Sequence, residues 1–157
     1  KEKYSPEFMA SVQFQSAIMG LTLAFKKKYG DEATKITEAF VEQMGIKMGN
    51  NFKEKGGITG SGIKEVERVL HIWLDPAYAP HRVKTNVDGN KLNFIREKPA
   101  TCRAMVVAKQ MNLPLETVCD TVAAPMFKGV AKAINPDVKT SNIQRTERKC
   151  IDIIEIS

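Results

Sequence analysis

Three cysteines and two histidines are the residues of this chain that could do nucleophilic or acid–base chemistry. Cys102 lies in "KPATCRAMVVAKQM", where a loop is expected to become a helix with Thr101 as its N-cap. A thiol at that place lies at the positive end of the helix dipole, which favours a thiolate, and Arg103 beside it adds positive potential. Cys102 is therefore a candidate nucleophile or metal ligand, and the alternative is a small buried residue at a helix start.

The other two cysteines lie in "LETVCDTVAAPMF" and "CIDIIEI". Cys119 is expected on a helix, either in the core or facing a pocket. Asp120 points about 100° away from it and should lie on the rim or in solvent. Pro125 falls inside the same helix and should kink or restart it. In the last strand, alternation places Cys150 and Asp152 on one face, which leaves the burial of this thiol open.

Both histidines fall near predicted apolar elements. His71 lies on a predicted helix, next to the stripe that includes Trp73, and His81 lies at the start of a predicted hairpin. Either imidazole could act as a general base or a ligand near neutral pH, and a structural role is the alternative. The chain has no C-x-x-C, Ser-His-Asp, P-loop or G-x-G-x-x-G pattern, so neither a metal site nor a particular cofactor is predicted.

The composition is that of a soluble globular protein. The length of 157 residues fits one domain, and the net charge of +6 is dispersed along the chain. With 3 Tyr and 1 Trp for stacking and no recognised motif, a nucleic-acid partner is not expected. We see no apolar run near the roughly 20 residues that span a bilayer, so no membrane partner is expected. An odd number of cysteines without a secretory signal favours reduced thiols in the cytoplasm.

Periodicity and turn signals predict a single α+β domain over residues 1–157, with a helical part at 1–62. Helices are expected at 6–29, at 31–55 and from 63 to the Asp75-Pro76 stop, then a hairpin around Asp88-Gly89. Helices follow from 102 and from about 114 to 134, and two strands surround a turn at 146–149. The order ααα-ββ-αα-ββ favours helices on one face of a four-stranded antiparallel sheet. The expected core-facing stripes are Phe8, Val12, Ile18, Leu21 and Phe25 on the first helix, and Ala33, Ile36, Phe40, Met44 and Met48 on the second.

The stretch from 102 to 150 resembles the C-terminal half of the L-2-amino-thiazoline-4-carboxylic acid hydrolase family. In that family a cysteine opens a helix, a second lies about one turn into the next helix, Asn-Pro precedes a strand and a third cysteine lies in the last strand. Cys102, Cys119, Asn135-Pro136 and Cys150 occupy those places. The element order is also similar to the four-vinyl-reductase ligand-binding domains, which bind small molecules and often dimerise.

The resemblance implies a hydrolase that adds water at the amidine-like ring carbon of 2-amino-thiazoline-4-carboxylate. It would open a cyclic amidine-type C–N bond toward a carbamoyl-cysteine, with an essential thiol. In this interpretation Cys102 is the nucleophile, Cys119 lies beside it, His71 moves protons and Arg103 binds the substrate carboxylate. The candidate residues are Cys102, Cys119 and His71 for catalysis, and Arg103, Trp73 and Asp120 for substrate binding.

Three positions depart from the family pattern. The acidic residue expected about one turn after the second cysteine is Ala123 or Ala124, Arg103 replaces a common Pro, and the turn before Cys150 reads "TERK". The missing acid and the three isolated cysteines favour the alternative of a non-catalytic small-ligand or thiol- or metal-sensing domain on the same scaffold. An interaction module that uses its basic surface is a third option. A small molecule is the expected partner, and the pattern allows a homodimer.

Overall fold

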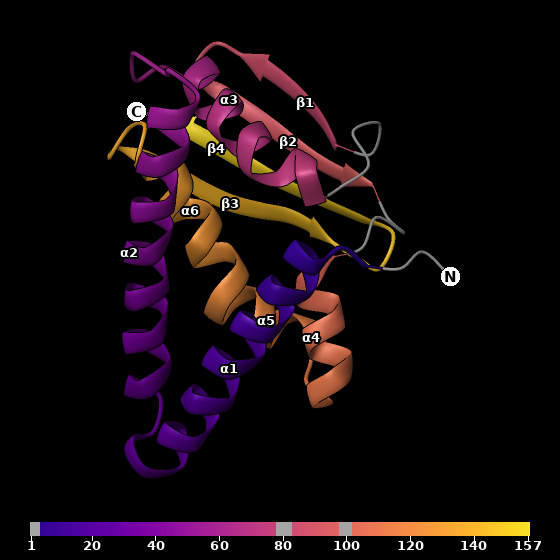
Figure 1. Cartoon of the computed structure of the whole chain (residues 1–157). Helices are drawn as coiled ribbons and strands as arrows, with labels where there is room; N and C mark the ends of the chain where they lie inside the picture. Colours follow the sequence, from indigo (N-terminus) through magenta and orange to yellow (C-terminus); the bar gives the residue numbers. More distant parts are fainter. Residues whose placement is uncertain (1–3, 78–82, 98–101) are drawn as a thin grey trace.

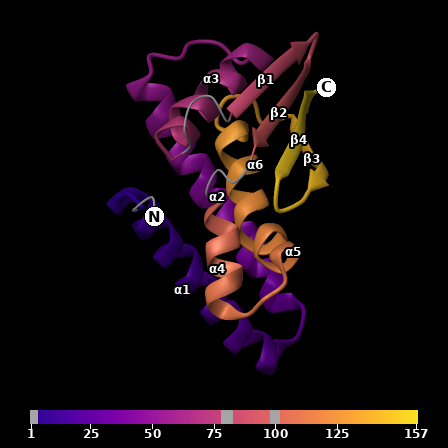
Figure 2. The ribbon, with the colours of Figure 1, turned by 90° about the vertical axis from the view of Figure 1, so that its right-hand side faces the viewer.

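The computed structural model describes residues 4–77, 83–97 and 102–157, so the predictions for His81 and Thr101 lie outside the described residues. It confirms the α+β class and the predicted order of helices and strands (Figures 1 and 2). The elements are α1 (Pro6–Tyr29), α2 (Glu32–Lys55), α3 (Ile63–Leu74), η1 (Asp75–Ala77), β1 (Val83–Asp88), β2 (Lys91–Glu97), α4 (Arg103–Met111), α5 (Leu115–Val118), the π-helical segment η3 (Cys119–Ala123), α6 (Ala124–Lys132), β3 (Val138–Arg145) and β4 (Lys149–Ile156).

The four strands form one antiparallel sheet in the order β1-β2-β4-β3. The first hairpin turns at Gly89-Asn90, one residue later than predicted, because Asp88 still pairs with Lys91. Gly89 has φ +57°, the left-handed conformation that such a tight turn needs. The second hairpin turns as predicted at 146–149, where the Thr146 amide donates to the Lys149 carbonyl at 2.9 Å.

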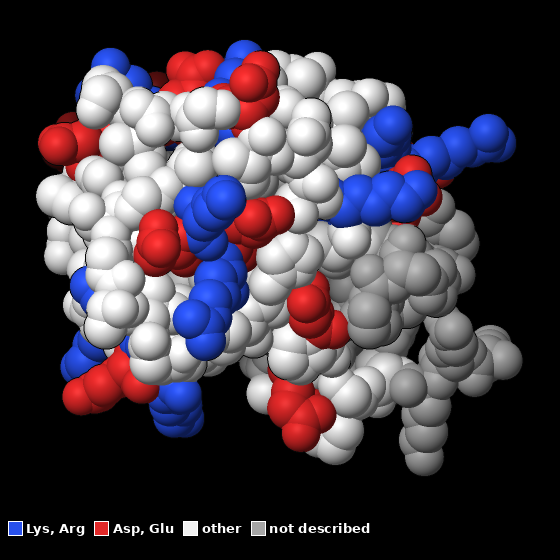
Figure 3. All heavy atoms as spheres, turned by 90° about the horizontal axis from the view of Figure 1, so that it is seen from above, with Lys and Arg blue, Asp and Glu red and all other residues white. Residues whose placement is uncertain are grey.

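Helices α3 and α6 cover one face of the sheet. Leu92 and Phe94 of β2 and Ile154 of β4 are fully buried against Phe127 and Val130 of α6. On the other face, alternate side chains of β1 and β3 are exposed, and the sheet is open. Seen from above, Lys and Arg are interspersed with Asp and Glu rather than gathered in one patch (Figure 3). Among the described residues, only the face of the sheet that packs against α3 and α6 is buried, and its side chains position the site described below.

The hairpin of α1 and α2 begins and ends where the sequence predicts. The Ser5 hydroxyl accepts a hydrogen bond from the Phe8 amide at 3.1 Å, and Gly30 ends α1 with φ +67°. Its buried stripe differs from the prediction, however. Gln15, Met19 and Thr22 are buried on α1, and Ala33, Val41, Gly45 and Gly49 are buried on α2.

Four residues predicted to face the core instead lie in solvent. Leu21, Phe25, Ile36 and Phe40 are between 51% and 62% exposed. The reason is that the helices approach one another along small and polar residues, which turns the large apolar side chains outward. The prediction was therefore wrong for these four residues, whereas Phe8, Val12 and Ala33 are buried as predicted.

Helices α2 and α6 cross at glycines. A Cβ on Gly45 would lie 2.5 Å from the Met126 carbonyl oxygen, and one on Gly129 would lie 2.9 Å from the Gly45 Cα. Beside this crossing, Glu42 forms ion pairs with Lys132 and Lys128 at 2.5 and 3.2 Å. Burial raises the pKa of Glu42, but the hydrogen bonds and charges of the two lysines outweigh burial and lower it. The two ion pairs of Glu42 therefore stabilise the fold at neutral pH. This stabilisation is lost as the pH falls through the lowered pKa of Glu42.

The glycine crossing makes a testable prediction. Gly129→Ala should lower the free energy of unfolding by about 1–3 kcal/mol or more, because the added methyl meets the backbone of α2. Gly20→Ala is the matched control, since its Cβ would meet only the Met111 Cε at 4.0 Å. That control should be neutral or stabilise the helix by about 0.5–1 kcal/mol. Urea unfolding of both variants measures the difference, and equal stability of the two would contradict the described packing.

Helix α1 is long and apolar enough to cross a membrane by length and composition, which the composition-based expectation missed. Core helices of soluble proteins and signal sequences pass the same test. In this fold α1 packs against α2 and α4 through Phe8, Val12 and Met19.

The predicted long helix from about 114 to 134 is divided into α5, η3 and α6. Pro125 is the second residue of α6, so the helix restarts at the proline as predicted. The π-helical turn before it carries Cys119 and Asp120. Single π-helical turns are rare and often found at functional sites, because the extra residue changes where side chains point.

Candidate functional site

All three cysteines line one cavity of about 370 Å³ between the sheet and the helices that cover it. Its walls come from the end of β2, the start of α4, η3, the start of α6, β3 and β4. Among the described residues, the lining is Arg96, Cys102, Ala104, Cys119, Asp120, Ala123, Ala124, Phe127, Thr140, Ser141, Asn142, Arg145, Cys150 and Asp152. A volume of this size suits a small molecule.

The sheet register places the polar residues in rows. Cys150 of β4 pairs with Arg96 of β2 on one side and with Arg145 of β3 on the other. Asp152, two residues along β4, pairs with Asn142 of β3. Because residues directly opposite each other in a sheet share a face, these side chains all point toward the helices.

A β-bulge decides that Arg145 belongs to this face. The register of β3 shifts between Asn142 and Gln144, so that Ile143 is the extra residue. Without the shift, the period of two from Asn142 would bring Gln144 to the cavity and turn Arg145 away. Ile143 is 61% exposed. The bulge therefore adds a guanidinium to the cavity wall.

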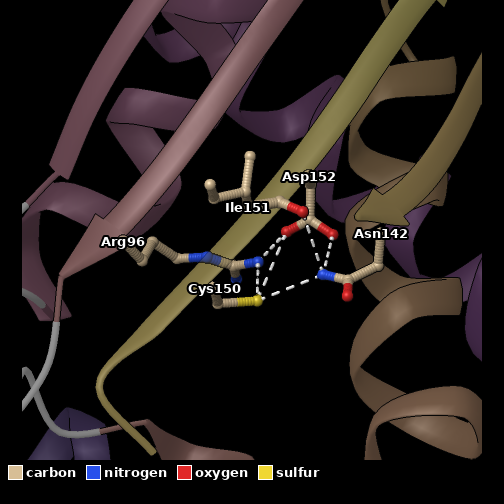
Figure 4. A network of polar contacts seen from close by, with 5 residues as sticks. All are labelled: Arg96, Asn142, Cys150, Ile151 and Asp152. Atoms are coloured by element: carbon tan, nitrogen blue, oxygen red, sulfur yellow. Dashed lines mark hydrogen bonds and ion pairs between the residues drawn. The ribbon is translucent and has the colours of Figure 1, made fainter. Parts of the chain in front are cut away.

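The Cys150 sulfur lies at the centre of a polar network (Figure 4). Arg96 Nη2 and Asn142 Nδ2 each lie 3.3 Å from Cys150 Sγ, and Sγ lies 3.9 Å from Asp152 Oδ2. Asn142 Nδ2 also donates to Asp152 Oδ1 at 2.9 Å and to the Ile151 carbonyl at 3.1 Å. Two donors thus face the sulfur where a thiolate would hold its charge, and a carboxylate lies near the thiol proton.

The Arg96–Asp152 ion pair is mostly buried. Their side chains are 16% and 12% exposed, and Arg96 Nη2 donates to Asp152 Oδ2. The guanidinium also lies 5.3 Å from the Phe127 ring centroid and 5.8 Å from that of Phe94. A cation held over two aromatic faces with a buried carboxylate is a rigid arrangement. The pair therefore fixes the position of the donor that faces the Cys150 sulfur.

A second ion pair lies at the rim. Arg145 Nη1 donates to Asp120 Oδ1 at 2.9 Å, and the side chains are 16% and 64% exposed. Burial lowers the pKa of Arg145, but the hydrogen bond to Asp120 and the negative potential of Cys119, Asp120 and Cys150 outweigh burial and raise it. Arg145 is therefore a permanent cation close to two thiols, held by a carboxylate that faces solvent.

The other two thiols enter the cavity from the helices. Cys102 is itself the N-cap of α4, since the helix begins at Arg103, and its side chain makes no capping hydrogen bond. It is half-buried, and Cys119 of η3 is buried. Asp120 lies on the rim, as its direction on a helix predicted.

Three predicted site residues, His71, Trp73 and Arg103, are not part of the described lining of this cavity. His71 lies between α3 and the first hairpin, with Nδ1 2.8 Å from Asp75 Oδ1 and Nε2 3.3 Å from Thr85 Oγ1. Trp73 packs in the core against Phe127, with ring centroids 6.4 Å apart. Arg103 is also absent from the described cavity lining. Helix periodicity placed His71 on one face of α3, but the packing of α3 on the sheet decides that the imidazole meets Thr85 of β1 rather than the thiols.

Sequence reasoning missed three residues of the cavity, Arg96, Asn142 and Arg145, and did not assign Asp152 a buried partner. One signal was available, because an aspartate that alternates with apolar residues in "CIDIIEI" must be buried and needs a partner. The identity of that partner depends on strand pairing across 56 residues of sequence, which no local pattern encodes.

The fold and the site define a small α+β protein with a thiol-lined cavity. No protein-family model, no curated protein and no solved structure matches this chain. Among the described residues, no group of three or more His, Cys, Asp or Glu is placed to hold a metal ion.

Proposed function

We propose that this protein is a thiol-dependent hydrolase that opens a cyclic amidine-type C–N bond in a small carboxylate. L-2-amino-thiazoline-4-carboxylate is the substrate that the resemblance to the L-2-amino-thiazoline-4-carboxylic acid hydrolase family implies. One observation carries the proposal: the Cys150 sulfur faces a small cavity while Arg96 and Asn142 both point donors at it from 3.3 Å. The nucleophile is therefore assigned to Cys150 rather than to Cys102, the candidate favoured by the sequence.

The proposed reaction uses the thiol twice. The Cys150 sulfur adds to the amidine carbon, and the ring nitrogen takes the thiol proton as its bond to that carbon breaks. Water then adds to the same carbon, the bond to Cys150 breaks, and the sulfur takes back a proton. The product is a carbamoyl-cysteine, one water heavier than the substrate. Asp152 Oδ2, 3.9 Å from the sulfur, lies where it can pass the thiol proton.

In this proposal Asp152 takes the place of the acidic residue that the family has about one turn after the second cysteine. This chain has Ala123 and Ala124 at that turn, and both line the cavity without a charge. Asp152 reaches the same cavity from β4, so the cavity keeps a carboxylate despite the alanines. Its location beside the Cys150 thiol supports the role of proton carrier.

Arg145 is the proposed site for the substrate carboxylate. It is a cation in the cavity wall opposite Cys150, and its carboxylate partner Asp120 lies at the solvent-exposed rim. A carboxylate that enters can take up a charge-assisted bond to the same guanidinium. Arg103, which the sequence favoured for this role, does not line the described cavity.

This role makes a prediction for Arg145→Gln. The KM should rise about 10–100-fold with a smaller change in kcat, because one charge-assisted hydrogen bond to the carboxylate is worth about 1.5–3 kcal/mol. Arg148→Gln, at an exposed arginine in the turn before β4, is the matched control and should leave both constants unchanged. Steady-state kinetics measure this, and an unchanged KM in Arg145→Gln would contradict the assignment.

A second candidate function is a non-catalytic sensor of small ligands or thiol chemistry. The observation that favours it is that Cys102 and Cys119 line the same cavity as Cys150, although one nucleophile suffices for hydrolysis. Incubation with L-2-amino-thiazoline-4-carboxylate, followed by mass spectrometry of the product, separates the two. Product formation supports the hydrolase. Binding without product, measured by calorimetry, supports the sensor.

A further inference from the structure

The α1–α2 hairpin carries an unusual arrangement of polar and apolar residues. Its closed end projects away from the sheet (Figures 1 and 2). Between the helices, the Thr22 and Thr37 hydroxyls are 2.7 Å apart and hydrogen-bonded, and Thr22 is buried. The polar residues are thus inside and the large apolar residues outside, the reverse of a soluble hairpin that acts alone. Five of the seven large exposed hydrophobics among the described residues belong to this half of the hairpin: Leu21, Phe25, Tyr29, Ile36 and Phe40.

These five side chains lie on one side of the hairpin. Leu21 precedes Thr22 by one residue, and Ile36 precedes Thr37 by one residue, at the point where the threonines meet. Two antiparallel helices in contact are related by a local two-fold axis perpendicular to the plane that contains both helices. This axis exchanges Thr22 with Thr37 and therefore Leu21 with Ile36, so Leu21 and Ile36 lie on the same side of the hairpin. The stripe of α1 and the stripe of α2 therefore form a single apolar face, extended along each helix by steps of four.

On α2 this face has opposite charges at its two ends. Glu32, Ile36, Phe40, Gln43 and Lys47 follow one another at steps of four, four, three and four, and all five are exposed. Neither Glu32 nor Lys47 has an ion-pair partner among the described residues. Glu32 and Lys47 are separated by 15 positions, a span of about 22 Å along the helix, and Phe40 lies close to the midpoint. When two copies of this helix lie antiparallel, the acidic end of each face therefore meets the basic end of the other, and the apolar centres meet.

We propose that this face is the interface of a two-fold homodimer, with α2 of one copy antiparallel to α2 of the other. The axis passes near Phe40, so that each Phe40 packs against its partner. Glu32 of each copy then lies opposite Lys47 of the other, which gives two equivalent ion pairs. Lys26, Lys27 and Lys28 lie at the closed end beside Asp31 and Glu32, so an anionic lipid surface is the other occupant that the tests below distinguish. The four helices bury the apolar stripes that the single chain exposes.

Sedimentation velocity on the full chain tests the interface. The wild type should sediment as a dimer at micromolar concentration, and Phe40→Glu should be a monomer, with a Kd raised at least about 100-fold. Ile143→Glu is the matched control: this isoleucine of β3 is 61% exposed, against 51% for Phe40, and its variant should stay dimeric. Circular dichroism checks that each variant is folded. A monomeric wild type, or a dimer that Phe40→Glu leaves intact, overturns the proposal.

Charge reversal tests the antiparallel arrangement. Glu32→Lys and Lys47→Glu should each weaken the dimer several-fold, because each places like charges opposite one another. The double variant Glu32→Lys/Lys47→Glu should restore wild-type affinity, which a purely structural effect would not do. A double variant as weak as the sum of the single ones overturns the arrangement. Cosedimentation of the wild type with phosphatidylserine vesicles that depends on Phe40 overturns it in favour of a membrane surface.

Discussion

Asp152→Ala should lower the free energy of unfolding by about 3–5 kcal/mol, the largest stability effect expected for this chain, because it removes the carboxylate of a buried ion pair. The Arg96 guanidinium would keep its charge at every accessible pH and would lose its carboxylate partner while still facing the Cys150 thiol. Urea unfolding followed by circular dichroism measures the change.

Asp120→Ala is the matched control for this prediction. It also removes an aspartate that pairs with an arginine of the same cavity, but its side chain is 64% exposed. Exposed ion pairs contribute about 0–1 kcal/mol, so this variant should unfold close to the wild type. The double variant Arg96→Met/Asp152→Leu should recover much of the lost stability, since apolar residues of similar size replace buried pairs well. Equal effects of the two alanine variants would contradict the buried pair.

Cys150→Ser should reduce turnover of L-2-amino-thiazoline-4-carboxylate by about 1000-fold or more, the largest effect expected on activity, because a serine hydroxyl is a far weaker nucleophile than a thiolate. Serine has nearly the same size and accepts the same two hydrogen bonds from Arg96 and Asn142. The fold should therefore be kept, and unfolding in urea checks this. Loss of product with wild-type stability is the expected result.

Cys102→Ser is the control at the thiol that the sequence favoured. Cys102 is the N-cap of α4 and makes no capping hydrogen bond, whereas serine is a preferred N-cap residue. This variant should keep turnover within about tenfold and gain about 0.5–1 kcal/mol of stability. If Cys102→Ser loses turnover and Cys150→Ser keeps it, Cys102 is the nucleophile and the assignment from the structure is wrong.

The elements of this fold could be predicted because their signals are local. Ser5 and Gly30 mark the ends of α1, Pro125 restarts α6, and the alternation in "CIDIIEI" places Cys150 and Asp152 on one face. The apolar stripes of α1 and α2 could be predicted only in part. Which face a helix buries depends on its neighbours, and among the described residues the outer side of the distal half of this hairpin is exposed.

The site could be predicted less well, because strand pairing and a bulge assemble it. Sequence spacing pointed to the cysteines but could not show that Arg96 lies beside Cys150, 54 residues away in sequence. The bulge at Ile143 reverses the faces of the last residues of β3, so alternation alone would bring Gln144 rather than Arg145 to the cavity. His71 was a reasonable candidate by residue type, yet α3 directs it to Asp75 and Thr85.

The most direct test of the proposed chemistry is to trap the thiol adduct. The wild type is mixed with L-2-amino-thiazoline-4-carboxylate, quenched with acid within the first turnovers, digested, and mapped by mass spectrometry. We predict a substrate-derived mass on the peptide that contains Cys150, absent in Cys150→Ser, together with a carbamoyl-cysteine product in solution. An adduct confined to the Cys102 or Cys119 peptide, or a folded wild type that forms neither adduct nor product, would contradict the account.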